Sequence, residues 1–236
     1  MNVLVSGADR GLGFGITKLL LKQGHRVYAG RYLRDWRDLD ELQKVYKEEL
    51  IVVDLDVSDS DSIILAKEVI KQSTDHIDMI ISNAAITGYM ESEEPMKTDY
   101  DRMLETYNVN SVGAVRLLEN FIELMEDSNL KRLCFISSEA GSITQAKRVE
   151  MFSYCMSKAA LNMYVKLIYN RLHNQGYSFR LYHPGWIRSY MRGHLAEEGH
   201  LSIDEAAQLA TDYFFDNEVD ESELILYGFD GEKFQY

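Results

Sequence analysis

Cysteine and basic residues are scarce in this chain, and each scarcity excludes a class of protein. Only two cysteines occur among 236 residues, which excludes a disulfide-rich secreted scaffold. The 25 Lys and Arg residues are outnumbered by 38 Asp and Glu residues, so the formal net charge is −13. This balance argues against nucleic acid or an anionic membrane as the main partner. No apolar run is long enough to span a bilayer, so we expect no membrane insertion.

Other absences narrow the location and the chemistry. A strand predicted to begin at Asn2 leaves no room for a signal peptide, so we expect a cytoplasmic protein. The six histidines are scattered without metal-ligand spacing, and we therefore predict no metal site. Cys134 lies in the apolar run Leu-Cys-Phe-Ile, which predicts a buried and unreactive thiol.

Strand and helix patterns alternate along the whole chain. Predicted strands span 2–6, 26–30, 50–55, 77–82, 131–137, 178–183 and 223–227. Predicted helices follow the first glycines as far as Gly24, then span 36–47, 60–72, 97–126, 151–174 and 202–215. The alternation predicts one α/β domain over 1–236, a Rossmann-type, doubly wound, mainly parallel seven-stranded sheet with helices on both faces. Within this domain, we expect 188–215 to form a substrate loop and helix region.

A glycine-rich turn joins the first predicted strand to the first predicted helix. Its sequence over 6–13 is Ser-Gly-Ala-Asp-Arg-Gly-Leu-Gly. Glycines let the backbone approach a pyrophosphate closely, and a helix N-terminus attracts anions. The turn therefore predicts a dinucleotide site, although a plain strand-to-helix turn can have the same pattern. Its Gly-x-x-x-Gly-x-Gly spacing differs from the Gly-x-Gly-x-x-Gly of other dinucleotide folds.

Tyr154 and Lys158 lie four residues apart in the predicted helix 151–174. Positions i and i+4 share one helix face, so the ammonium can stand beside the phenol. A phenol has a free pKa of about 10, and a nearby cation lowers that pKa and makes Tyr154 a usable proton donor to a carbonyl. Alone, this spacing is usually surface decoration. Together with the glycine turn it predicts a hydride-transfer enzyme.

The end of the second predicted strand favours NADP(H), while NAD(H) stays possible. An acid at this end would bind the adenine ribose hydroxyls and repel a 2′-phosphate. The sequence over 29–31 is instead Ala-Gly-Arg, so Arg31 can pair with the phosphate and Arg10 can add a second cation. Ordinary solvated surface is the alternative role for both arginines. Asp35 complicates the choice, because it could reach back toward a ribose.

These motifs, in this order, resemble the short-chain dehydrogenase/reductase family over nearly the whole chain. Ser6 stands where that family has Thr, and Ala85 stands where it has Gly. Matching segments are also Asp56-Val57, Asn83-Ala84-Ala85, Asn110, Ile136-Ser137-Ser138 and Pro184-Gly185-Trp186-Ile187-Arg188-Ser189. The motifs Ser-Glu-Ala-Gly-Ser-Ile, Ser-Lys-Ala-Ala-Leu-Asn and His-Pro-Gly-Trp, with the ending Tyr-Gly-Phe-Asp-Gly, most resemble the Sniffer and C-factor branch of carbonyl reductases.

The resemblance implies a role for each matching residue. Tyr154 would be the general acid in reduction and the base in oxidation, and Ser138 would bind the substrate oxygen. Lys158 would hold the nicotinamide ribose, and Asn110 would hold a helix distortion. The implied cofactor-binding residues are Gly7, Asp9, Arg10, Gly11, Leu12, Gly13, Arg31, Asp56, Val57, Asn83, Ala84, Ala85, Asn110, Tyr154, Lys158, Pro184, Gly185, Trp186, Ile187 and Ser189. Ser142 competes with Ser138, because 145–150 lengthens the interval before the tyrosine.

The resemblance implies an NADP(H)-dependent oxidoreductase of the carbonyl reductase or alcohol dehydrogenase type. Its substrate would be a small-molecule carbonyl compound, either a ketone or an aldehyde, or the corresponding alcohol. Helices 100–126 and 151–174 resemble the family's dimer-forming pair, so we expect a homodimer or homotetramer. An apolar substrate wall is expected from Met90, Met96, Met151, Phe152, Trp186, Tyr190 and Met191, unless these residues are core. The alternatives are a non-catalytic NADP(H)-sensing regulatory protein that binds a protein partner, and a sugar epimerase.

Overall fold

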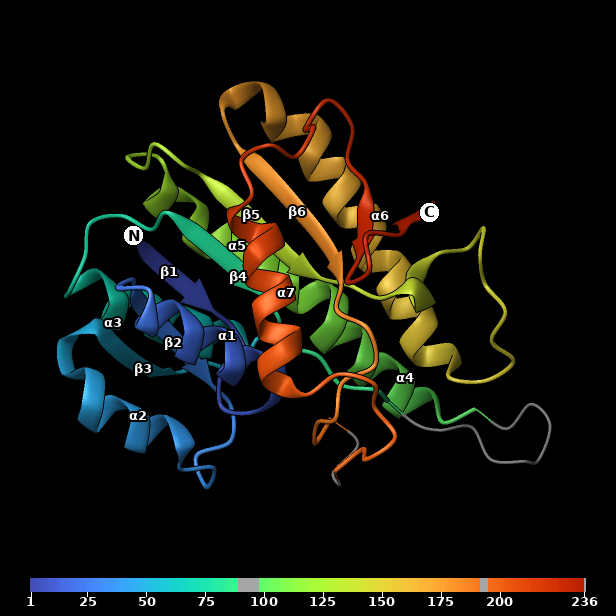
Figure 1. The fold of residues 1–236 in the computed structure, drawn as a ribbon, viewed down its shortest axis with the longest axis horizontal. Coiled ribbons are helices and arrows are strands. Elements are labelled where there is room, and N and C mark those ends of the chain that lie inside the picture. The colour runs from blue at the N-terminus through green and yellow to red at the C-terminus, as the bar shows by residue number, and fades with distance from the viewer. Residues whose placement is uncertain (89–97, 192–194, 236) are drawn as a thin grey trace.

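An eight-stranded sheet forms the centre of the molecule (Figure 1). The computed structural model describes residues 1–88, 98–191 and 195–235. The strand order is β3-β2-β1-β4-β5-β6-β7-β8, and β7–β8 is antiparallel while the other neighbouring pairs are parallel. The strands are β1 (Asn2–Val5), β2 (Arg26–Arg31), β3 (Leu50–Asp54), β4 (Met79–Ser82), β5 (Arg132–Ile136), β6 (Ser178–His183), β7 (Leu226–Gly228) and β8 (Lys233–Phe234).

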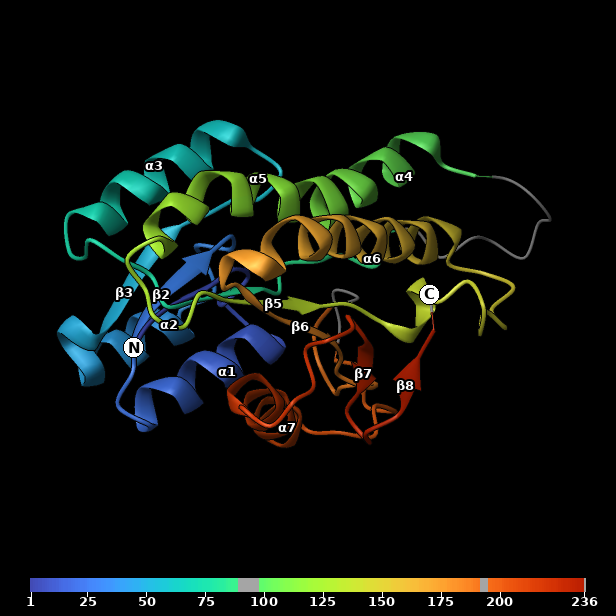
Figure 2. The same ribbon diagram turned by 90° about the horizontal axis from the view of Figure 1, so that it is seen from above.

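Helices cover both faces of this sheet (Figure 2). One layer contains α3, α4, α5 and α6, and the other contains α1, α2 and α7. The helices are α1 (Gly11–Lys22), α2 (Asp38–Tyr46), α3 (Ser60–Lys71), α4 (Tyr100–Tyr107), α5 (Gly113–Phe121), α6 (Phe152–Leu172) and α7 (Ile203–Phe215). The predicted doubly wound, mainly parallel α/β fold is thereby confirmed.

The strands are apolar throughout because both of their faces are buried. In β1, Val3 and Val5 belong to the core cluster of the α1 and α7 layer, whereas Leu4 between them belongs to the opposite cluster. All three side chains are fully buried. Successive side chains of a strand point to opposite faces, so one short segment contributes to two cores.

Local polar contacts fix where several helices begin. The Asp59 side chain accepts a hydrogen bond from the Asp61 amide at the start of α3 and so caps this helix. At α7, Ser202 and Glu205 bond reciprocally to each other's backbone amides in a capping box. These caps set the lengths of the loops that reach the sheet edge.

Two predicted elements differ from the structure. The predicted helix 97–126 is divided into α4, a π-helical turn (Asn108–Val112), α5 and a 3-10 turn (Ile122–Met125), and residue 97 lies outside the described residues. The sheet has eight strands rather than seven, because β8 folds back on β7 after the turn at Gly231 (φ 83°). Two-residue strands such as β8 are too short to show a hydrophobic period.

The sheet also determines where a ligand can bind. β1 lies between β2 and β4, so the chain connections turn in opposite directions on its two sides. In open α/β sheets, ligands bind in the crevice outside the carboxyl ends of the strands at such a point. The glycine turn follows β1 at this position.

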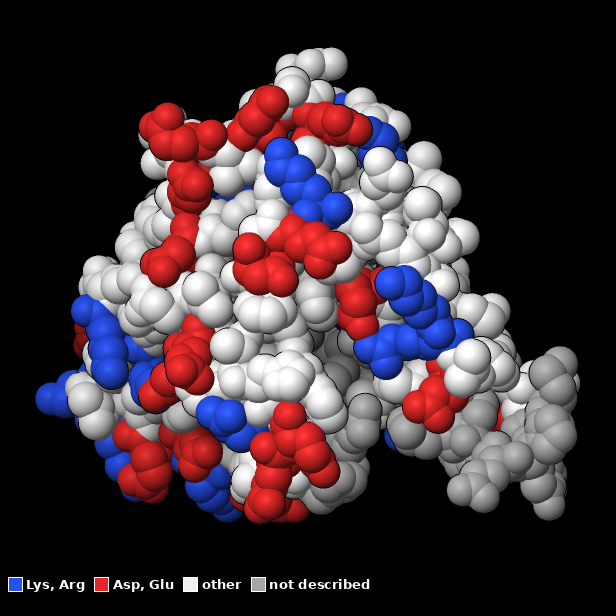
Figure 3. All heavy atoms as spheres, turned by 45° about the vertical axis from the view of Figure 1, so that its right-hand side comes forward, with Lys and Arg blue, Asp and Glu red and all other residues white. Residues whose placement is uncertain are grey.

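Acidic side chains are spread over most of the face drawn in Figure 3, and basic side chains lie among them singly or in a small group. This distribution agrees with the net charge of −13. Among the described residues, no helix combines the length and the hydropathy needed to cross a bilayer.

Candidate active site

A cavity of about 790 Å³ opens at the carboxyl ends of β1, β4, β5 and β6. The predicted site residues that line it are Gly7, Asp9, Arg10, Gly11, Leu12, Asp56, Val57, Asn83, Ala84, Ala85, Ser138, Tyr154, Lys158, Pro184, Gly185, Trp186, Ile187 and Ser189. Gly13, Arg31 and Asn110 were also predicted but are not among the lining residues. The structure therefore gathers into one cavity residues that are spread over most of the sequence.

The glycine turn forms one end of the cavity. Gly7 and Gly11 have positive φ angles of 64° and 57°, which favour glycine. A Cβ atom on Gly13 would lie 2.2 Å from the Gly7 carbonyl oxygen, so this glycine allows the close packing of the turn rather than lining the cavity. In the described chain, no side chain caps α1, and its first turn contains no acid. The positive end of this helix is thus left available to an anion.

The turn is held against the end of β4 by side-chain hydrogen bonds. The Ser6 hydroxyl oxygen accepts from the amides of Asn83 (3.0 Å) and Ala84 (3.1 Å). In return, the Asn83 side-chain amide donates to the carbonyls of Ser6 and Gly7, both at 2.9 Å. These bonds explain why a hydroxyl is needed at residue 6 and an amide at residue 83.

The arginine at the end of β2 does not lie on the cavity wall. The Arg31 guanidinium donates to Asp40 (2.8 Å) and Asp54 (3.1 Å), and its side chain is only 18 % exposed. Arg10 does line the cavity, and its guanidinium carbon lies 5.8 Å from the centre of the Trp36 ring. The sequence motif places Arg31 correctly at the strand end, but it does not reveal the two carboxylates that engage its side chain.

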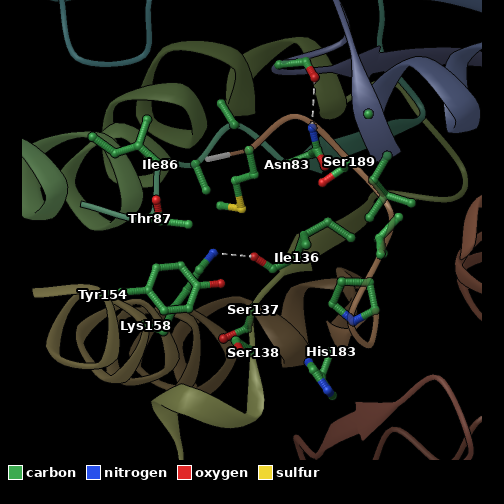
Figure 4. A pocket seen from close by; sticks show the side chains of 18 of the residues that line it. Asn83, Ile86, Thr87, Ile136, Ser137, Ser138, Tyr154, Lys158, His183 and Ser189 are labelled. Atoms are coloured by element: carbon green, nitrogen blue, oxygen red, sulfur yellow. Dashed lines mark hydrogen bonds between the residues drawn. The ribbon is translucent and has the colours of Figure 1, made fainter. Parts of the chain in front are cut away.

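Tyr154 and Lys158 lie on one face of α6, and the Tyr154 hydroxyl points into the cavity (Figure 4). The Lys158 ammonium lies 5.8 Å from the centre of the Tyr154 ring and donates to the Ile136 carbonyl at 2.9 Å. Lys158 is 2 % exposed, and this burial lowers its pKa to about 8. The predicted pair is therefore present, with the amine anchored to the end of β5.

The expected lowering of the Tyr154 pKa is wrong for the protein as it stands. The pKa of Tyr154 is raised to about 12, mainly by burial and also by the negative charge of Glu139. The Ser138 hydroxyl and the charge of Arg148 act in the opposite direction. Desolvation thus outweighs the nearby cations, and Tyr154 is neutral at physiological pH.

The structure separates the two candidate serines. Ser138 follows β5 and lines the cavity that Tyr154 also lines. The Ser142 hydroxyl donates to the Gln235 carbonyl at the end of the chain, and Ser142 is not among the lining residues. The geometry therefore favours Ser138 as the serine beside a reacting group.

Asn110 lies in the π-helical turn behind the cavity and is 2 % exposed. Its side-chain oxygen accepts from the Ile86 amide and its nitrogen donates to the Ile86 carbonyl, both at 2.8 Å. The same nitrogen donates to the Ser157 hydroxyl at 2.9 Å. Asn110 thus joins the segment after β4 to α6, where its partner Ser157 directly precedes Lys158.

Several lining residues were not predicted as site residues. They include Tyr32, Ser58, Ile86, Thr87, Glu139, Arg148, His183, Phe229, Asp230, Glu232 and Phe234. The last four belong to the β7–β8 hairpin, whose Asp-Gly turn could have been recognised at 230–231. Of the expected apolar wall, Met151, Trp186, Tyr190 and Met191 line the cavity, Phe152 does not, and Met90 and Met96 lie outside the described residues.

Comparison with known proteins agrees with this geometry. The family model described as short chain dehydrogenase matches residues 1–199. C-signal of Myxococcus xanthus is 31% identical over 120 residues, which cover 51% of this chain and 71% of that protein. The NADPH-bound carbonyl reductase from chicken fatty liver has a TM-score of 0.86 at 25% identity, covering 100% of this chain and 98% of that one.

Carbonyl reductase Sniffer of D. melanogaster has a TM-score of 0.85 at 21% identity, covering 100% and 99% of the two chains, a likeness in fold. C-signal and Sniffer are thus both among the proteins that this chain resembles. The predicted family is confirmed by the match over residues 1–199: the chain belongs to the short-chain dehydrogenase family of oxidoreductases.

Proposed function

We propose that this chain is an NADP(H)-dependent oxidoreductase that interconverts a ketone or aldehyde and the corresponding alcohol. The observation that supports this most directly is that Tyr154, Ser138 and Lys158 meet in the cavity that also contains the glycine turn. A volume of about 790 Å³ suits a bound organic cofactor or substrate. Membership of the family supports the oxidoreductase class, and the carbonyl substrate is our inference.

The residues around the glycine turn fit a pyridine nucleotide. The uncapped start of α1 and the close packing at Gly13 fit a pyrophosphate, which Gly11 and Leu12 would hold. Asp56 and Val57 would hold the adenine, and Tyr154 and Lys158 the nicotinamide ribose. The nicotinamide would be held by Pro184, Gly185, Trp186, Ile187 and Ser189. Beside the glycine turn, the cofactor would also contact Asn83, Ala84 and Ala85. When bound, the cofactor supplies the hydride, and the protein supplies orientation and polarisation.

NADP(H) is proposed as the preferred cofactor. Arg10 places a cation on the cavity wall beside the turn, where a 2′-phosphate needs one. Arg31 would contribute once its guanidinium is shared between the phosphate and Asp40 and Asp54. The similar chicken carbonyl reductase binds NADPH, which supports the same preference here. NAD(H), which lacks that phosphate, would bind more weakly.

Tyr154 is proposed as the proton donor to the carbonyl oxygen in reduction. A pKa of about 12 keeps its phenol protonated at neutral pH, as an acid requires. In oxidation the same group must accept a proton, and the charge on Lys158 would favour the phenolate. Ser138 would stabilise the negative charge that develops on the substrate oxygen.

The substrate is proposed to be bulky and largely apolar. Met151, Trp186, Tyr190 and Met191 line the cavity together, and methionine adapts its shape to varied ligands. We propose that the segment 188–215 determines which carbonyl compound enters.

The low cysteine content supports a cytoplasmic location.

Replacing Tyr154 with Phe tests the proposed reaction. We expect Tyr154→Phe to lower kcat by at least ~100-fold, because the proton donor is removed while the ring is kept. The assay measures the carbonyl-dependent oxidation of NADPH and of NADH side by side, over a panel of carbonyl substrates. Tyr164→Phe on the same helix is the matched control, since Tyr164 does not line the cavity, and it should retain turnover.

The same experiment separates the enzyme from the alternative of a non-catalytic NADP(H) sensor. A sensor would bind NADPH, detected by fluorescence, but would turn over no carbonyl compound in either form. Equal turnover by Tyr154→Phe and the unmodified enzyme would contradict the assignment of Tyr154. NADPH binding retained by the inactive variant would show that the loss is chemical rather than structural.

A further inference from the structure

An ion pair lies beside the proposed catalytic residues, and the mechanism above does not use it. Glu139 directly follows Ser138 in the sequence. One of its carboxylate oxygens accepts a hydrogen bond from the Ser138 hydroxyl at 2.5 Å. Its other oxygen binds the Arg148 guanidinium. Glu139 and Arg148 both line the cavity, with side chains 32 % and 42 % exposed.

The pair connects the end of β5 to the start of α6. Glu139 begins the 3-10 turn Glu139–Gly141, which follows β5. Arg148 belongs to the segment leading into α6, and its second terminal nitrogen lies 3.6 Å from the Met151 sulfur. Met151 is 4 % exposed and immediately precedes α6. Contacts at both ends of its guanidinium therefore hold Arg148 in place near Tyr154.

Tyr154 lies within the electrostatic influence of both partners. The carboxylate of Glu139 raises the pKa of Tyr154, and the guanidinium of Arg148 lowers it. The other groups that influence or approach Tyr154 are Ser138, Cys155 and Lys158. The two opposite charges therefore partly cancel at the phenol.

His183 faces the same carboxylate from β6. Its Nδ1 lies 3.5 Å from a Glu139 oxygen. Burial lowers the pKa of His183, Glu139 and Asp230 raise it, and Arg148 and Lys158 lower it. His183 is therefore a second group that senses both charges.

We propose that Glu139 and Arg148 are positioning residues of the reaction: the carboxylate holds the Ser138 hydroxyl until a substrate oxygen replaces it as the acceptor, and the ion pair balances a negative against a positive charge beside Tyr154. This inference rests on the proposed function. It implies that removing the negative charge and removing the positive charge shift the pH dependence of proton transfer in opposite directions. Removing both charges should leave this pH dependence close to that of the unmodified enzyme.

The test is the pH dependence of kcat/KM for alcohol oxidation, in which Tyr154 acts as the base. Glu139→Gln should shift the apparent pKa of the profile down by about one pH unit, and Arg148→Gln should shift it up by about one. The double variant should lie within about 0.3 unit of the unmodified enzyme. A merely structural role would lower kcat/KM at every pH without opposite shifts.

Two controls accompany these variants. Glu41→Gln removes an exposed carboxylate that pairs with Lys44 on α2, and it should leave the profile unchanged. Arg148→Lys keeps the positive charge, so its apparent pKa should stay near that of the unmodified enzyme. Single variants that shift the profile in the same direction, or not at all, would overturn the proposal.

A measurement that needs no turnover distinguishes the failure of this inference from the failure of the proposed function. Proton NMR follows the titration of His183, whose resonance is identified because it is missing in His183→Gln. The pKa of His183 should fall in Glu139→Gln and rise in Arg148→Gln. An active enzyme with unshifted pH profiles would remove this inference alone. An unmodified enzyme without carbonyl or alcohol turnover would remove the proposed function and this inference together.

Discussion

At the scale of single residues, Lys158 combines a proposed catalytic role with an unfavourable environment. Its ammonium is almost completely buried, and the one protein acceptor that it contacts is the Ile136 carbonyl in the described part of the chain. Burial brings its pKa from 10.5 to about 8, because a low-dielectric environment disfavours the charged form. The amine proposed to hold the nicotinamide ribose is therefore expected to reduce stability at neutral pH.

Replacing Lys158 with Met should separate stability from activity. The folded pKa lies below the unfolded one, so the unfolded chain binds the extra proton between about pH 8 and 10.5, and stability rises with pH there. Below about pH 8 the full penalty remains, ~3 kcal/mol for a shift of this size. The substitution removes this penalty but also loses the hydrogen bond to Ile136, which costs ~1–2 kcal/mol. Lys158→Met should therefore be more stable than the unmodified protein by ~1–2 kcal/mol at pH 7.

Urea unfolding at several pH values checks this expectation, together with the carbonyl assay. The gain in unfolding free energy should shrink as the pH rises from 8 toward 10.5, while turnover is lost at every pH. A Lys158→Met protein that is less stable than the unmodified one at pH 7 would show that the hydrogen bond to Ile136 outweighs the buried charge.

Sequence reasoning was most informative where geometry follows from spacing alone. Tyr154 and Lys158 could be placed on one helix face because the helical period is fixed. Arg31 could be placed at a strand end, but its partners Asp40 and Asp54 come from other elements, so the direction of its side chain could not be predicted. Glu139 and Arg148 were missed for the same reason, since their contact depends on how the chain folds after β5.

At the scale of elements, the π-helical turn Asn108–Val112 is the main departure from the predicted fold. A π turn inserts a residue into an otherwise helical run, and such insertions are frequent at functional sites. Asn110 bonds to both backbone groups of Ile86, and the Ser111 hydroxyl donates to the Ser157 carbonyl at 2.7 Å. These contacts compensate for the local irregularity by tying the turn to two neighbouring segments.

Asn110→Ala should therefore weaken both the fold and the proposed site. The change leaves the half-buried amide and carbonyl of Ile86 without their partner, which should cost ~1–3 kcal/mol of unfolding free energy. Loss of the bridge to α6 should also lower kcat by about tenfold or more. Asn120→Ala on α5, whose side chain bonds only within its own helix in the described structure, is the control. Equal stability of the two variants would contradict this role for Asn110.

The predicted helix and strand positions were close where hydrophobic periodicity is strong. β6 has its predicted bounds, and α3 ends one residue before its predicted end. The π turn lies where the resemblance implied a helix distortion at Asn110, but no local period encodes it, since it depends on Ile86 and Ser157. β8 was missed because it depends on pairing with β7. Tertiary contacts decide such elements.

At the scale of the whole molecule, large apolar side chains remain exposed on α4 and α6. On α4 these are Tyr100 and Leu104, which are 74 % and 66 % exposed, and on α6 they are Met163 and Leu167, which are 62 % and 58 % exposed. The two helices pack against each other on the same layer (Figure 2). Adjacent exposed apolar residues of this size are typical of a protein–protein interface.

We expect these helices to mediate the homodimer or homotetramer predicted from the sequence. Light scattering after size exclusion should give a mass of two or four chains. Leu167→Glu should lower that mass to one chain at micromolar concentration, because it places a charge within a buried apolar contact. Val45→Glu on α2, where Val45 is 70 % exposed, should leave the mass unchanged. A monomeric unmodified protein would refute the expectation.

The β7–β8 hairpin has a consequence for the order of events during synthesis. Phe229, Asp230 and Phe234 complete the cavity wall, and Ser142 is bonded to Gln235. A nascent chain that still lacks these residues would have an incomplete cavity wall beside β6. Catalytic competence should therefore appear abruptly, after translation has passed the hairpin, rather than grow gradually as the polypeptide emerges from the ribosome.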